Sequence, residues 1–173
     1  TNGVLTITTL KNSRTNISNI TLGSSSRLNN YGNLSITNLT VESSTINNYG
    51  NLNWTNPNFK SASITNNGLI SVPGLLALNN VTFYQNGTLS IPGNSITINY
   101  SSTLEIQNSG LNLTTLIIES GGVLNHKANS ASYLYSANVT AINLTIKSGG
   151  IINTSGKGYT AGNGPGGGST AAF

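Results

Sequence analysis

Aliphatic and polar residues alternate in short runs along most of the chain, and the runs recur at a nearly fixed interval. In Asn33-Leu34-Ser35-Ile36 the aliphatic residues occupy every second position, which is the pattern of a β-strand buried on one face. A similar run follows at Leu39 and Val41, and a third begins at Ile46. Three short strands within about 18 residues predict one turn of a β-helix.

The unit returns with its turn residues in place. Gly32, Gly50 and Gly68 are 18 residues apart, and Gly87 follows 19 residues later. We expect each glycine to supply a positive φ at a corner where a Cβ would collide. A side-chain amide precedes each glycine by two positions, and we expect these amides to form a hydrogen-bonded ladder along the solenoid. The ladder residues are Asn30, Asn48, Asn66 and Gln85.

The repeat can be extended in both directions. Residues 4–7 follow a glycine and are interpreted as the first copy, with Leu5 equivalent to Leu34 and Ile7 equivalent to Ile36. Towards the C-terminus the same inward register is assigned to Leu104, Ile106, Leu124, His126 and Ile152.

These patterns predict an all-β protein, a parallel β-helix with rungs of about 18–20 residues. A β-sandwich is the alternative, because strands of this composition serve both folds. The solenoid is expected over residues 1–155, with an insertion at about 126–137. Residues 156–173 are rich in glycine and are expected to form an irregular tail. Since the sequence lacks methionine, we expect the chain to be a fragment of a longer protein.

Charge is scarce. Charged residues make up 6% of the sequence, against roughly 25% in an ordinary soluble domain. Seven Lys and Arg against three acidic residues give a net charge of +4. There is no basic run and no interleaving of Arg with aromatic residues, which argues against a nucleic-acid partner. No apolar run is long enough to span a membrane.

The candidates for catalysis are few. The acidic residues are Glu42, Glu105 and Glu119, and only Glu105 and Glu119 are predicted to be about one rung apart. We interpret all three as solvated strand residues and predict no catalytic residue. His126 is the only histidine and has no Cys or Asp partner, so no metal site and no cofactor are expected.

Aromatic residues suggest a second class of function, the binding of sugars. Trp54 and Phe59 fall at inward positions and are expected to fill the core. The candidates for stacking on a glycan are Tyr31 and Tyr49, which should also stack on each other at a corner, and Tyr133 and Tyr135 in the insertion.

Asn-x-Ser/Thr sequons are frequent. A strand in which Asn and Thr flank an inward aliphatic residue contains a sequon by alternation alone, without any selection for glycosylation. The same alternation turns the asparagine towards solvent, where a glycan would fit. The candidates for N-glycosylation are Asn33, Asn38, Asn112 and Asn143.

The last third of the chain is similar in sequence to segments of known proteins. The segment Ser148-Gly149-Gly150-Ile151-Ile152-Asn153, followed by Ser155-Gly156-Lys157-Gly158-Tyr159 and Gly162-Asn163-Gly164, resembles a segment of very large secreted bacterial and archaeal β-helix surface proteins. The resemblance implies a right-handed β-helix of the pectate-lyase-like kind. An 18-residue rung would also suit a left-handed helix.

Taken together, we expect an extracellular or cell-surface module of structural or adhesin type that forms a segment of a rigid rod or filament. Its partners would be glycans or other copies of the same surface protein. Two alternatives remain at this point: a carbohydrate-binding module, and a polysaccharide-degrading β-helix from a phage tail or a secreted enzyme. The second would require Glu105 or Glu119 for activity.

Overall fold

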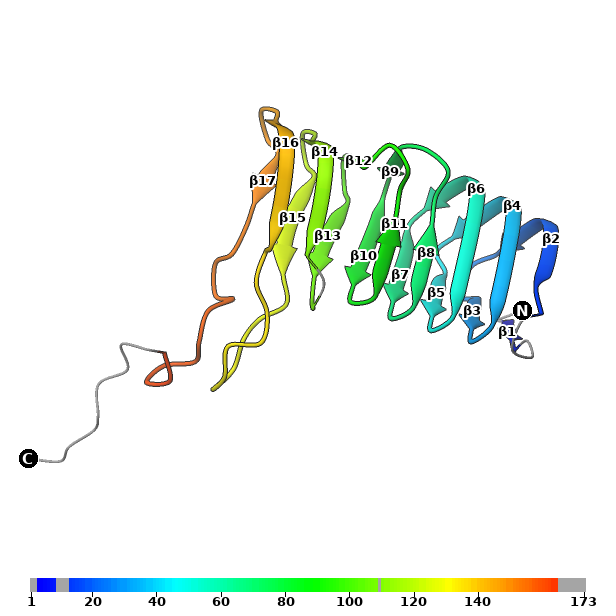
Figure 1. Ribbon diagram of the computed structural model, residues 1–173, viewed down its shortest axis with the longest axis horizontal. Coiled ribbons are helices and arrows are strands. Elements are labelled where there is room, and N and C mark those ends of the chain that lie inside the picture. The colour runs from blue at the N-terminus through cyan, green and yellow to red at the C-terminus, as the bar shows by residue number, and fades with distance from the viewer. Residues whose placement is uncertain (1–2, 9–12, 109, 165–173) are drawn as a thin grey trace, which may run out of the picture.

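The computed structural model describes residues 3–8, 13–108 and 110–164. The chain winds into a parallel β-solenoid of about six turns, and the described residues contain no helix (Figure 1). The predicted fold class is confirmed, and the β-sandwich is excluded because the strands are paired in parallel, turn upon turn. Accordingly, no described helix could cross a membrane.

The strands form three parallel sheets along the solenoid axis. The first sheet has eight strands in the order β1 (Val4–Ile7), β3 (Arg27–Asn30), β5 (Thr45–Asn48), β7 (Ala62–Asn66), β10 (Val81–Gln85), β13 (Thr103–Ile106), β15 (Val123–His126) and β17 (Ile151–Ile152). The second has five: β11 (Thr88–Ser90), β8 (Leu69–Ser71), β6 (Asn51–Lys60), β4 (Asn33–Glu42) and β2 (Thr15–Leu22). The third has four: β16 (Val139–Ile146), β14 (Leu111–Ile118), β12 (Ser95–Ile98) and β9 (Leu76–Leu78).

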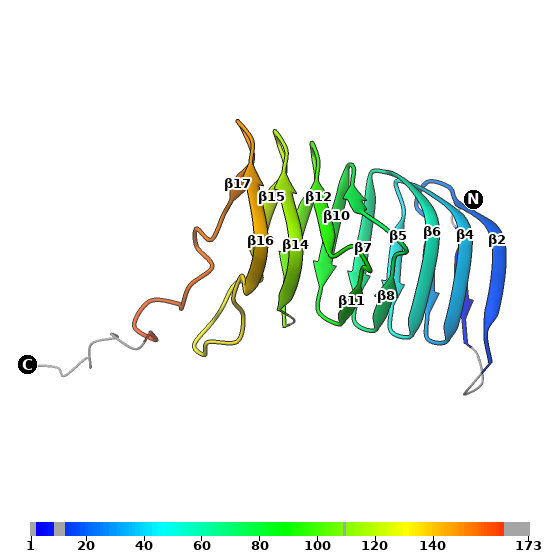
Figure 2. The same ribbon diagram turned by 45° about the horizontal axis from the view of Figure 1, so that its top comes forward.

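The first two of the three strand runs predicted for each turn are continuous in the early turns. β4 contains both Leu34 and Val41, and it changes phase where Thr37 and Asn38 are exposed in succession. Further along, the same path is divided, as in β8 followed by β9. In Figure 2 the strands β2, β4, β6 and β8 lie side by side along one long side of the solenoid.

The core is a stack of inward aliphatic and aromatic side chains from successive turns. On the first sheet one column is fully buried, and each member is paired with the next: Leu28, Ile46, Ile64, Phe83, Leu104 and Leu124. Trp54 and Phe59 are buried as predicted, with an edge-to-face ring contact at 5.6 Å between centroids.

The register predicted for both ends was wrong. Leu5 is paired with Leu28 on the first sheet, whereas the partner of Leu34 in the preceding turn is Thr15 on the second sheet. The later aliphatic residues that were assigned to the column of Leu34 and Ile36 also belong to the first sheet. Period-two alternation identifies an inward position but not the side of the solenoid to which it belongs.

The positive φ predicted for the corner glycines is wrong, whereas the predicted collision of a Cβ at these corners is confirmed. A Cβ on Gly50 would lie 2.2 Å from the carbonyl oxygen of Gly32, and on Gly68 it would lie 2.1 Å from that of Gly50. None of these glycines has a positive φ. The left-handed conformation instead recurs just before each first-sheet strand from β3 to β17, at Ser25, Ser43, Ser61, Asn80, Ser101, Gly121 and Gly149.

The irregular segments lie towards the C-terminal end. Residues 127–138 join β15 to β16 without a strand, and residues 153–164 follow β17. These segments are joined by hydrogen bonds from the amide N of Asn129 to the carbonyl of Lys157 at 3.0 Å and from Thr160 to Ser130 at 3.1 Å. The rest of the predicted tail, 165–173, lies outside the described residues.

Candidate functional site

The four amides of the predicted ladder form an unbroken row inside the solenoid. Asn30 Nδ2 donates to Asn48 Oδ1 at 2.8 Å, Asn48 Nδ2 to Asn66 Oδ1 at 2.9 Å, and Asn66 Nδ2 to Gln85 Oε1 at 3.1 Å. All four side chains are fully buried. Because solvent does not reach them, these residues hold the turns together and are not a binding surface.

The same column continues beyond the amides. Gln85 is paired with Ile106, and Ile106 with His126. His126 is buried, and its Nδ1 donates a hydrogen bond of 2.8 Å to the carbonyl of Lys127. The histidine therefore closes the column where the insertion begins. The described residues contain no group of three or more His, Cys, Asp or Glu that could hold a metal ion.

Tyr31 and Tyr49 are exposed and stacked. Their ring centroids are 4.9 Å apart and their planes differ by 4°. This separation matches the spacing between strands, so each ring lies flat against the ring of the next turn. One face of each ring is thus covered by the other tyrosine and is not available for stacking on a sugar.

Tyr133 and Tyr135 belong to the insertion and differ in environment. Tyr133 is 60% exposed and lies 6.0 Å from the ring of Tyr159, and Lys127 Nζ is 4.9 Å from the ring centre of Tyr135. The buried Asn129, which the sequence reasoning did not single out, fixes this insertion. Its Oδ1 accepts from the amides of Leu134 and Tyr135 at 2.7 Å each.

The four candidate glycosylation sites differ in how their amides are used. Asn38 is exposed, but its Nδ2 donates to Asn19 Oδ1 at 2.8 Å. Asn33 is half-buried, with Nδ2 donating to the carbonyl of Ser13 at 2.9 Å. Asn112 on β14 and Asn143 on β16 are exposed, with no side-chain hydrogen bond to another described residue. Since a glycan is attached at Nδ2, the last two are the more accessible acceptors.

Each glutamate has its own lysine. Glu42 pairs with Lys60 at 2.9 Å, Glu119 with Lys147 at 2.7 Å, and Glu105 with Lys157 at 3.3 Å. Glu105 lies on β13 of the first sheet, and Glu119 follows the end of β14 of the third sheet. The two carboxylates predicted to be about one rung apart thus lie on β13 and just after β14, and each is paired with a different lysine.

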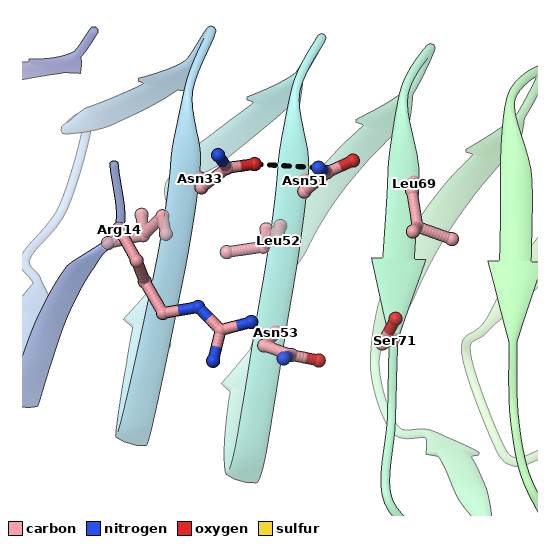
Figure 3. Close-up of a pocket in the computed structure, with 8 residues that line it drawn as sticks. Arg14, Asn33, Asn51, Leu52, Asn53, Leu69 and Ser71 are labelled. Atoms are coloured by element: carbon pink, nitrogen blue, oxygen red, sulfur yellow. Dashed lines mark hydrogen bonds between the residues drawn. The ribbon is translucent and has the colours of Figure 1, made fainter. Parts of the chain in front are cut away.

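A groove on the outward face of the second sheet was not anticipated. Its first part is a hollow of about 140 Å³, lined by Arg14, which directly precedes β2, and by polar residues and leucines of β4, β6 and β8. Figure 3 shows the Arg14 side chain running across β4 towards Asn53. Above it, Asn51 Nδ2 donates to Asn33 Oδ1 at 2.6 Å.

The groove continues along the solenoid into a second hollow of about 260 Å³. Asn53 and Ser71 line both parts, and two prolines border the far part. Trp54 also lines the far part, and its buried indole Nε1 has no hydrogen-bond acceptor among the described residues. The far part is lined by Ser35, Asn53, Trp54, Thr55, Ser71, Val72, Pro73, Ser90 and Pro92.

Part of this groove could have been recognised from the spacing of polar residues in the sequence. Ser35, Asn53, Ser71 and Ser90 are separated by 18, 18 and 19 residues, so they share one register of the repeat. Arg14 lies in the less regular N-terminal region, and nothing in the spacing places it beside Asn53.

In comparisons with known proteins, no family model, no curated protein and no solved structure matches the chain.

Proposed function

We propose that this chain is an extracellular structural or adhesin-type module that forms a segment of a rigid surface rod. The supporting observation is the eight-stranded parallel sheet that runs from β1 to β17 without interruption. A solenoid whose turns contact only their neighbours grows in length with each added turn, and such an architecture suits a spacer that carries a binding surface away from its anchor.

The surface chemistry supports an exposed location. With 6% charged residues, the solenoid relies on outward rows of asparagines for its polarity. Asn47 Nδ2 donates to Asn29 Oδ1 at 2.9 Å, and Asn86 Nδ2 donates to Asn67 Oδ1 at 2.9 Å. A surface of hydrogen-bonded amides depends little on salt, because ionic screening acts on charges. Low sensitivity to salt suits a protein on the outside of a cell, where the ionic strength of the medium varies.

Immunogold labelling of intact cells from the source organism tests the location. Antibodies raised against the folded 173-residue chain are expected to label the outer surface without permeabilisation. Antibodies against a cytoplasmic protein serve as the control for cell integrity. Labelling that appears only after permeabilisation would contradict an extracellular role.

A further inference from the structure

We propose that the groove on the outward face of β4, β6, β8 and β11 binds a glycan chain that carries carboxylate or sulfate groups. Arg14 would contact the anionic group, and the polar floor would contact the sugar hydroxyls. The proposal rests on the extracellular function proposed above and gives that function a ligand class.

The first argument comes from the distribution of charge. All three glutamates of the sequence are paired with lysines. Arg14 has no ion pair within the described residues, and it lies at the mouth of a hollow. A guanidinium presents five donors in a planar fork that matches carboxylate and sulfate oxygens. An unpaired guanidinium at the edge of an otherwise neutral groove favours an anionic ligand.

The second argument comes from the floor. Ser35 is paired with Asn53, and Asn53 with Ser71, so each turn adds one polar side chain to a single column. Ser90 extends this column on β11. Adjacent strands lie about 4.8 Å apart, so a polymer lying along the axis would meet a hydrogen-bonding group at every turn.

The third argument comes from the apolar border of the far part of the groove. Pro73 and Pro92 offer apolar surface for the C–H faces of the sugar.

Nucleic acid is the other polyanion to weigh. Binding a nucleic-acid backbone requires several cations along one track, but Arg14 is the only cation that lines either described part of the groove. One anion contact beside a row of amides and hydroxyls matches a sugar chain better than a phosphate chain.

Isothermal titration calorimetry tests the proposal directly. Alginate supplies carboxylates, dextran sulfate supplies sulfates, and uncharged dextran is the neutral control. We expect saturable heats of binding with alginate, dextran sulfate or both, which identifies the anionic group. We expect no saturable heat with dextran.

Arg14→Gln should weaken binding roughly tenfold or more, because hydrogen bonds to charged groups contribute about 1.5–3 kcal/mol. Arg27→Gln is the matched control, since Arg27 is an exposed arginine on β3 of the first sheet. Equal affinities of the two variants would overturn the proposal, as would equal binding of dextran or tighter binding of single-stranded DNA. Circular dichroism confirms that both variants remain folded.

The outcome is separable from that of the surface-labelling experiment. Surface labelling without glycan binding would reject the groove and keep the extracellular rod. Arg14-dependent binding without surface labelling would reject the proposed location and keep the groove as a binding site.

Discussion

At the scale of single residues, stability depends on buried amides that are satisfied by one another and by neighbouring backbone groups. Asn48 accepts from Asn30 and donates to Asn66, and its Nδ2 also lies 3.0 Å from the carbonyl of Leu69. Removing this side chain leaves a donor without an acceptor on one side and an acceptor without a donor on the other. Each unsatisfied buried group costs about 1–3 kcal/mol.

Asn48→Ala is therefore expected to lower the free energy of unfolding by about 2 kcal/mol or more, measured by urea denaturation followed by circular dichroism. The control is Asn47→Ala, which removes a neighbouring amide of a partly buried outward row. We expect the control to cost about 1 kcal/mol or less, because water can replace its partner. Similar losses for both variants would mean that burial of the ladder is not what stabilises it.

At the scale of the turn, the close approach of backbones at the glycine corner limits what the repeat tolerates. Gly68→Ala would place a Cβ 2.1 Å from the carbonyl oxygen of Gly50. Gly50 and Gly68 directly precede the paired strands β6 and β8, and the amide of Leu69 donates to the carbonyl of Gly50, so neither glycine can move without disturbing the pairing. We expect a loss of roughly 3 kcal/mol or more, measured as a lower urea midpoint.

Gly74→Ala is the matched control for this corner. Gly74 follows β8 in a loop, and a Cβ built on it meets no atom within 4 Å. The substitution should change stability by about 0.5 kcal/mol or less. Equal stability of Gly68→Ala and Gly74→Ala would contradict the close approach of the backbones of Gly50 and Gly68.

The turn is also the scale at which sequence reasoning was most and least successful. The stretch from Gly32 to Gly87 repeats strand, amide and glycine together, so three signals agree on one fold and the β-solenoid could be predicted. At Leu5 and Leu104 only alternation remained, and alternation does not distinguish the three sides of the solenoid. The groove could not be predicted because Arg14 and Asn53 meet through the reach of one long side chain across a neighbouring turn.

At the scale of the whole molecule, the solenoid has two different ends. The edge strands are β1 and β2 at one end and β16 and β17 at the other (Figure 1). At the second end, inward residues of the last turn are exposed: Leu144 by 51%, Ile146 by 46% and Ile152 by 41%. Below them lies a hollow of about 240 Å³ with an apolar lining that includes Leu116 and Leu124.

Exposed apolar surface beside unpaired strand edges promotes association. Because all turns run in the same direction, β1 of a second copy can add to β17 as the next parallel strand, and such a head-to-tail contact does not close into a dimer. We therefore expect the isolated 173-residue chain to form concentration-dependent oligomers, measured by sedimentation velocity.

The double substitution Leu144→Lys and Ile152→Lys should abolish this association, because it would bury two charges without partners in the contact. Thr145→Lys is the control: Thr145 is exposed and lies between the inward residues Leu144 and Ile146 on β16, so its side chain points away from the hollow. If the unsubstituted chain stays monomeric over the whole concentration range, the exposed last turn is not a self-association surface. If the control variant also dissociates, added charge rather than the position of the apolar residues governs assembly. Retained association of Thr145→Lys together with a monomeric double variant would place the contact between copies at the open end of the solenoid.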